Sequence, residues 1–176
     1  IFFTPTHYAP RFSPIPTVIS IMDLSFIFYP EMFKKSDLLQ LTNWTAYSVK
    51  KAAKILTISK ASKDDIINIY KVKSDKIEVI YPGIKEILYM DELRKKYGTI
   101  GEYILFVGTL QPRKNIVRLI EAFSQIVKKH PQIKLVIVGR KGWLWEDIIT
   151  APQKFSVEEK VTFLDFISDG ELASLY

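Results

Sequence analysis

The chain has 176 residues, of which 48% are hydrophobic and 25% are charged, and its formal net charge is +6. This composition is sufficient to bury a hydrophobic core, and the absence of cysteine excludes a disulfide framework and a thiolate metal site. No apolar run approaches the ~20 residues that span a bilayer, and the first residues lack the pattern of a signal peptide.

Six short apolar runs predict strands, and most of them are bounded by Pro, Gly, Ser or Asp. They are Thr17–Met22, Ile55–Ser59, Lys76–Tyr81, Tyr103–Val107, Lys134–Val138 and Val161–Leu164. Several are apolar at successive positions, which is typical of parallel strands buried on both faces. Because the opening residues Ile1-Phe2-Phe3 also resemble the inside of a strand, we expect the chain to be a piece of a longer protein.

Helical patterns lie between most of these runs. One runs from Ser36 to about Ala53, and Ser62-Lys63-Asp64-Asp65 resembles a capping-box start for a short helix that ends near Tyr70. A third begins after Asn115, and its apolar residues share one face. They are Ile116, Leu119, Ile120, Phe123 and Val127. Strands that alternate with helices predict parallel α/β layers.

The chain divides at a polar stretch that follows Pro82-Gly83. We interpret Gly83–Glu102 as an interdomain connection with a short helix, which predicts two domains, 1–83 and 84–176. Each domain supplies only three or four strands, fewer than the five or six of a complete doubly wound sheet. We therefore expect both domains to be incomplete.

The most informative stretch is the turn that follows the strand Tyr103–Val107. It runs from Gly108 through the adjacent cations Arg113 and Lys114 to the start of the helix after Asn115. Backbone N–H groups and the positive end of a helix dipole attract anions there, and the cations add charge. This position favours a diphosphate site over an ordinary solvated turn.

A second glycine, Gly139, follows the next strand and opens Gly139-Arg140-Lys141-Gly142-Trp143. Ligands approach the backbone at such glycines when they lie at the carboxyl ends of parallel strands. A plain turn that needs a positive φ explains Gly139 equally well, and Arg140 and Lys141 are then only solvated.

In the first domain, polar residues also follow the strands. Asp23 is suited to orient a substrate hydroxyl or, as the favoured alternative, to cap the next segment. Ser59 and Lys60 are suited to meet an acceptor or simply to begin a helix. His7 lies beside the first strand and is a weak site candidate, whereas His130 is interpreted as a partner of a helix dipole.

Several classes of function are disfavoured. No His/Asp/Glu cluster has the spacing of metal ligands, and the serine hydrolase, P-loop and dehydrogenase fingerprints are absent. Residues 1–98 hold 15 Lys/Arg against 10 Asp/Glu, which is nearly the whole positive surplus. These cations are dispersed, so we expect no nucleic-acid partner; an anionic membrane, an anionic substrate or mere solubility remain as explanations.

Six stretches, in order along the chain, resemble the retaining glycosyltransferases of the group 1 (family 4) type, with mannosyltransferase-like variants. They are Ile21–Phe26 with Pro30-Glu31, Ile55–Ser62, Val79–Gly83, Leu105–Asn115, Lys134–Trp143 and Val161–Phe166 with Glu171–Ala173. The resemblance implies a GT-B fold of two Rossmann-like domains. The first part, 1–83, would then belong to the acceptor-side domain and 84–176 to the linker and the first half of the nucleotide-sugar-binding domain.

The resemblance also implies roles for individual residues. Gly108, Arg113 and Lys114 would hold the donor diphosphate, with Lys114 as the main cation. Other positions would line the nucleotide pocket or the acceptor side of the cleft. For the pocket they are Gly139, Lys141, Phe163 and Leu164, and for the acceptor side Asp23, Ser59 and Lys60.

Two departures from the family pattern affect these roles. Met22 stands where the family usually has a histidine, and we hypothesise that His7 substitutes for it. The glutamate-bearing loop that binds the donor sugar would follow Tyr176, so the isolated chain is expected to be inactive.

The resemblance therefore predicts transfer of a sugar, with mannose from GDP-mannose as one candidate, to a glycan or lipid-linked acceptor with retention and without a metal or cofactor. The departing phosphate would help to deprotonate the acceptor. We expect a cytoplasmic protein, with peripheral contact on the inner face of the membrane as a hypothesis. A non-catalytic nucleotide-binding or regulatory module with a degenerate fold is the alternative, and Met22 favours it.

Overall fold

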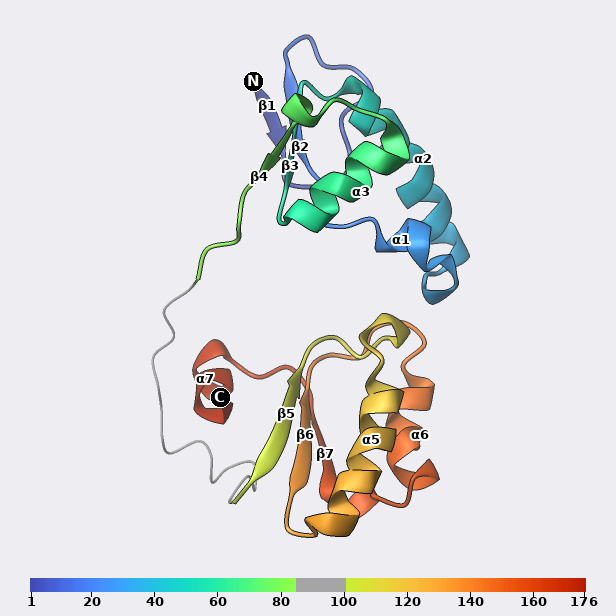
Figure 1. Cartoon of the computed structure of the whole chain (residues 1–176), viewed down its shortest axis with the longest axis vertical. Coiled ribbons are helices and arrows are strands. Elements are labelled where there is room, and N and C mark those ends of the chain that lie inside the picture. Colours follow the sequence, from blue (N-terminus) through green and yellow to red (C-terminus); the bar gives the residue numbers. More distant parts are fainter. Residues whose placement is uncertain (85–100) are drawn as a thin grey trace. The chain divides into compact units, whose positions relative to one another are not determined.

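The computed structural model describes residues 1–84 and 101–176 (Figure 1). It divides into two compact units, Ile1–Ile84 and Lys85–Tyr176, and each is described here by itself. Most of the predicted connection 83–102, including its short helix, lies outside the described residues.

The first unit is built on a sheet of four parallel strands in the order β1-β2-β3-β4. The strands are β1 (Phe2–Thr4), β2 (Thr17–Ser20), β3 (Lys54–Thr57) and β4 (Ile77–Val79). The register places Ile19 opposite Ile55 and Ile55 opposite Ile77, and none of these three side chains is exposed to solvent. A row of branched side chains therefore crosses the sheet and forms the centre of the core.

Three helices accompany this sheet: α1 (Ser25–Phe28), α2 (Lys35–Lys51) and α3 (Lys60–Tyr70), with 3₁₀ turns at Pro30–Met32 and Ser74–Lys76. They contribute Phe26, Val49 and Ile66 to the core. The prediction that the helix ending near Tyr70 starts at Ser62 is wrong. Helix α3 begins at Lys60, because the side chain of Ser59 accepts the N–H of Ser62 and caps the first turn.

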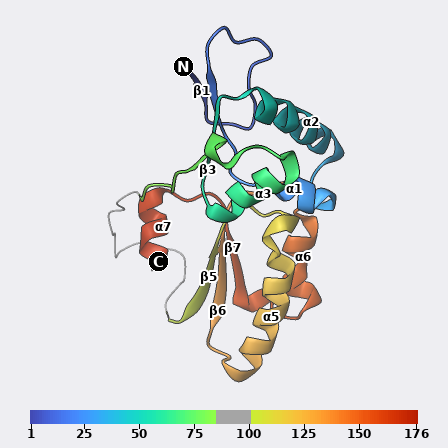
Figure 2. The ribbon, with the colours of Figure 1, turned by 45° about the horizontal axis from the view of Figure 1, so that its top comes forward.

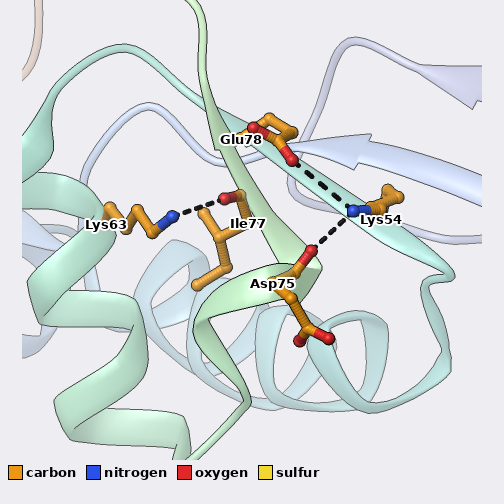
Figure 3. Close-up of polar contacts among 5 residues, drawn as sticks. All are labelled: Lys54, Lys63, Asp75, Ile77 and Glu78. Carbon is orange, nitrogen blue, oxygen red and sulfur yellow. Dashed lines mark hydrogen bonds and ion pairs between the residues drawn. The ribbon is translucent and has the colours of Figure 1, made fainter.

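Two lysines, one in β3 and one in α3, form polar contacts with the edge strand β4 and the turn before it (Figure 3). Lys54 at the start of β3 donates to the carbonyl oxygen of Asp75 at 2.5 Å and lies 3.5 Å from the Glu78 carboxylate. Lys63 in α3 donates to the carbonyl oxygen of Ile77 at 2.8 Å. Some of the excess positive charges of the first unit are therefore engaged in polar contacts within that unit.

The second unit has a sheet of three parallel strands in the order β5-β6-β7, and the predicted strands are confirmed to the residue. They are β5 (Tyr103–Val107), β6 (Lys134–Val138) and β7 (Val161–Leu164). Helices cover both faces: α5 (Ile116–Lys129) and α6 (Glu146–Lys154) lie on one side and α7 (Asp169–Leu175) on the other (Figures 1 and 2). The remaining 3₁₀ turns are Pro112–Lys114 and Glu158–Lys160.

The central strand β6 shows why both faces must be covered. Leu135 and Ile137 pack in the core that includes α5 and α6, whereas Val136 and Val138 pack in the core that includes α7. All four are buried, so the continuous apolar run marks a strand between two helical layers. The expected parallel α/β architecture of both domains is confirmed.

None of the helices that the structure describes is both long enough and apolar enough to cross a membrane.

Candidate functional site

The parallel strands of the second unit bring three loops to one edge of the sheet. Val107 pairs with Val138 and Val138 with Leu164, so β5, β6 and β7 end at the same level. The residues that follow them are Gly108, Gly139 and Asp165. Loops at the carboxyl ends of such strands are where α/β proteins bind ligands.

Gly139 allows the first two loops to touch through their backbones. Its φ is 152°, and a Cβ atom at this position would overlap the carbonyl group of Gly108. Its N–H donates to the carbonyl oxygen of Leu164 at 3.0 Å, which ties the loop to β7 as well. Gly139 is therefore more than a turn residue, since only glycine leaves room for this approach.

Hydrogen bonds continue the pairing of the two loops beyond the strands. The N–H of Leu110 donates to the carbonyl oxygen of Arg140, and the N–H of Gly142 donates to that of Leu110, both at 2.9 Å. A Cβ atom on Gly142 would lie 2.9 Å from the same Leu110 oxygen. The loops after β5 and β6 thus form one rigid backbone surface at the predicted diphosphate site.

Lys114, one of the two adjacent cations of the first loop, lies next to this surface. Pro112–Lys114 form a 3₁₀ turn, and Asn115 adopts a left-handed conformation with φ of 54° before α5 begins. The Lys114 Cε lies 3.9 Å from the position that a Cβ on Gly108 would occupy. The structure therefore brings Gly108, Lys114 and the start of a 14-residue helix together. This combination suits an anion.

The two cations of the second loop rest on aromatic rings. The Arg140 guanidinium carbon lies 4.4 Å from the centroid of the Phe166 ring, and the Lys141 Nζ lies 4.0 Å from that of Trp145. Such contacts hold a flexible charged side chain in place. Arg140 and Lys141 are therefore oriented rather than only solvated.

Phe163 and Leu164, which are predicted to line the nucleotide pocket, are partly buried and pack toward the two cores of this unit. Phe163 packs against the core beneath α5 and α6, and Leu164 packs against the core beneath α7. In a strand with both faces covered, alternate side chains enter the two cores. Only the backbone of Leu164 reaches the loops, through the bond from Gly139.

Gln111 is a further polar residue of this loop, and no sequence pattern marks it. This residue is 5% exposed, and its Oε1 is buried without a hydrogen-bond partner among the described residues. It lies between the buried Leu110 and the Pro112–Lys114 turn, so an amide oxygen is placed inside the loop that is predicted to bind an anion. A glutamine in a loop carries no pattern that distinguishes it, and only its burial makes it notable.

In the first unit, the residues that are predicted to form the acceptor side lie at the carboxyl ends of β1, β2 and β3. His7, Asp23 and Ser59 follow these three strands in turn. The Ser62 hydroxyl donates to the carbonyl oxygen of Met22 at 2.8 Å, and the Ser59 hydroxyl lies 3.0 Å from that of Ser62. The loops after β2 and β3 are therefore linked at the predicted acceptor site.

Asp23 forms a local turn just before α1, whose N-cap is Leu24. Its Oδ1 accepts the Ser25 N–H at 2.8 Å and the Ser25 hydroxyl at 2.5 Å, so it holds the following segment as the favoured alternative predicts. Ser59 caps α3, and Lys60 is the exposed first residue of that helix. These local roles leave a contact with an acceptor as a prediction.

His7 lies against the core of this unit and close to Asp23. Its ring centroid is 5.9 Å from that of Phe26. Burial lowers the pKa of His7, and the negative charge of Asp23 opposes that shift in pKa. The imidazole is therefore neutral near pH 7. An uncharged ring and a carboxylate lie near each other at the carboxyl edge of the first sheet.

Within residues 1–84 and 101–176, no group of three or more His, Asp or Glu side chains is arranged to hold a metal ion. Transfer without a metal stays a prediction.

Two family models match the chain from end to end. Residues 2–86 match the model described as Glycosyltransferase Family 4, and residues 90–176 match the model described as Glycosyl transferases group 1.

Similar proteins agree with these matches. An uncharacterized glycosyltransferase of Methanocaldococcus jannaschii is 31% identical over 139 residues, which are 73% of this chain and 35% of that protein. The O-antigen chain mannosyltransferase RfbU of Salmonella typhimurium is 28% identical over 158 residues, which are 90% of this chain and 42% of that protein. The chain thus spans less than half the length of these curated relatives.

Among solved structures, Anabaena HepE in complex with UDP and glucose superimposes with a TM-score of 0.68 at 22% identity, covering 90% of this chain and 44% of HepE. At that identity the likeness concerns the fold, which is of the GT-B type.

Proposed function

Because the chain belongs to the group 1 and family 4 glycosyltransferases, we propose that its protein transfers a sugar from a nucleotide-diphosphate donor, with retention, to a glycan or lipid-linked acceptor. The observation that carries this proposal is the pair of glycine loops joined at Gly139, with Lys114 beside Gly108 at the start of α5.

This arrangement suits a departing diphosphate. As the bond from the sugar to the phosphate breaks, negative charge grows on the phosphate oxygens, and fixed N–H groups and cations stabilise it. Lys114 supplies a positive charge on a flexible side chain, and the preceding residue, Arg113, adds a planar guanidinium with several N–H donors. Backbone hydrogen bonds pair the two loops, so little reorganisation is needed when the donor binds.

The nucleotide would extend from the diphosphate toward the loop after β6. Gly139 lets the ligand approach the backbone there, and Lys141 supplies a positive charge held by Trp145. The similarity to a mannosyltransferase, at 28% identity, supports mannose as the sugar and GDP-mannose as the donor.

Asp23, Ser59 and Lys60 would face the acceptor, since they lie at the carboxyl edge of the first sheet. The positive surplus of that part of the chain favours a peripheral position on the cytoplasmic face of an anionic membrane, where lipid-linked acceptors reside.

The test uses the full-length protein and a panel of donors that includes GDP-mannose, UDP-glucose and UDP-N-acetylglucosamine, each with and without EDTA. We expect transfer from one donor, unchanged by EDTA, and a product whose NMR coupling constants give the anomeric configuration of the donor. A product of inverted configuration would contradict the proposed reaction.

The second candidate is a non-catalytic nucleotide-binding module, which Met22 at the edge of the first unit favours. Met22 is 39% exposed, and its thioether neither titrates nor donates a hydrogen bond. The same panel separates the two candidates: a module of this kind would bind a nucleotide sugar in calorimetry and release it unchanged.

A further inference from the structure

His7 is held in a position that packing alone does not explain. Its ring lies against Phe26, which is 2% exposed, and its Nδ1 is buried without a hydrogen-bond partner among the described residues. A buried polar atom without a partner destabilises the folded state, because it has lost its hydrogen bonds to water. A phenyl ring would avoid that cost at the same place.

The other ring nitrogen, Nε2, is the one left to meet a ligand. The neutral state of the ring suits it to exchange a hydrogen bond with a hydroxyl group, as donor or as acceptor. Asp23 lies close enough for its charge to affect the ring, and its carboxylate is fixed by Ser25. Two groups that bind hydroxyls therefore lie together after adjacent strands.

We propose that Nε2 of His7 hydrogen-bonds a hydroxyl group of the sugar acceptor. The inference rests on the proposed function, because it takes this edge of the first sheet as the acceptor site. His7 differs from Asp23 and Ser59, whose side chains accept hydrogen bonds from backbone N–H groups in the first turns of helices. Its side chain forms no hydrogen bond to a described residue that would account for a histidine here.

The test compares His7→Phe, His7→Asn and His7→Gln in the full-length protein. The amide nitrogen of Gln can reach the place of Nε2, whereas that of Asn matches the buried Nδ1. We expect His7→Phe and His7→Asn to reduce kcat/KM for the acceptor about tenfold, the equivalent of one lost hydrogen bond. His7→Gln should retain more activity, and KM for the nucleotide sugar should be unchanged in all three.

Thermal melting supplies a readout that a purely structural role would move in the opposite direction. His7→Phe removes the buried unpaired nitrogen and keeps a ring against Phe26, so its melting temperature should equal or exceed that of the wild type. His130→Gln is the matched control, because His130 is the other histidine and lies exposed after α5. It should change neither acceptor kinetics nor melting.

The outcomes separate the inference from the function on which it rests. A wild-type protein that transfers no sugar would contradict the proposed function. Where the wild type is active, full acceptor kinetics in His7→Phe and His7→Asn would overturn the role of His7 alone. A clear drop in the melting temperature of His7→Phe would overturn it in either case, since the ring would then be structural.

Discussion

Lys114 is the residue on which the proposed donor site depends most. Its side chain lies beside Gly108 at the start of α5, where a helix terminus and a cation act on the same anion. A hydrogen bond to a charged group contributes about 1.5–3 kcal/mol. We therefore expect Lys114→Ala to weaken binding of a nucleoside diphosphate to the full-length protein about tenfold to a hundredfold, measured by calorimetry.

Lys129 provides the control, because it is an exposed lysine at the far end of the same helix. Lys129→Ala removes the same charge and should leave the affinity within the error of the wild type. Equal losses in both variants would mean that only the net charge of the unit matters, and the site would have to be placed elsewhere.

Gly139 is expected to be intolerant of any side chain. A Cβ there would overlap the Gly108 carbonyl group, so Gly139→Ala must separate the two loops or strain the backbone, at a cost of about 1–3 kcal/mol. Urea unfolding measures this loss. Gly101 also has a positive φ, 105°, but no atom lies within 4 Å of its Cβ position.

Gly101→Ala therefore reports backbone strain alone, and the excess cost of Gly139→Ala reports the contact between the loops. If the two substitutions cost the same, the close approach at Gly139 contributes nothing to stability.

At the scale of single residues, the sequence predicted which positions gather and missed how they are held. The proximity of Gly108 and Lys114 could be predicted, because the end of a strand and the start of the next helix can both be recognised in the sequence. The close approach of the Gly139 and Gly108 backbones joins residues that are far apart in the chain, and no local sequence pattern encodes it. Phe163 packs against the core although it lies near a strand end, so its part in a nucleotide pocket stays a prediction.

Among the elements, α3 shows how a cap defines a helix. Ser59 accepts the N–H of Ser62 at 3.1 Å, so Ser59→Ala should reduce the free energy of unfolding by about 1 kcal/mol. Ser59→Asp should retain the cap, since a carboxylate accepts the same bond and favours the helix dipole. Chemical denaturation of the three proteins checks the order.

These two variants also separate the two roles predicted for Ser59. If its hydroxyl contacts the acceptor, Ser59→Asp will keep stability and still change KM for the acceptor. Unchanged kinetics in a stable Ser59→Asp protein would leave Ser59 as a helix cap and nothing more.

The strands could be predicted because they are continuous apolar runs bounded by turn residues, and the long helices because their apolar residues recur on one face. The α3 start was misplaced because Ser59 and Ser62 are both serines near its first turn, and the sequence does not say which one caps. Helix α7 begins with a capping box of Ser168 and Glu171, a pattern that is visible in the sequence. Helix α6 contains Pro152, which obscures a helical pattern although the proline is buried in the folded unit.

For the whole molecule, the distribution of charge is the property that sequence and structure describe together. Lys54 and Lys63 are engaged in the first unit, by hydrogen bonds to backbone carbonyl oxygens and, for Lys54, by the Glu78 ion pair. Surface pairs of this kind contribute little to stability. Exposed lysines such as Lys71 and Lys73 remain available to a negatively charged surface.

We therefore expect the full-length protein to sediment with vesicles in proportion to their content of anionic lipid, and to be released as salt shortens the Debye length to about 8 Å at 0.15 M. Lys71→Gln with Lys73→Gln should reduce the bound fraction, because each basic residue near the surface contributes about 1 kcal/mol. The matched pair Lys128→Gln with Lys129→Gln removes the same charge from the second unit and should have no effect. Equal effects of both pairs, or binding that does not depend on anionic lipid, would mean that the surplus serves solubility alone.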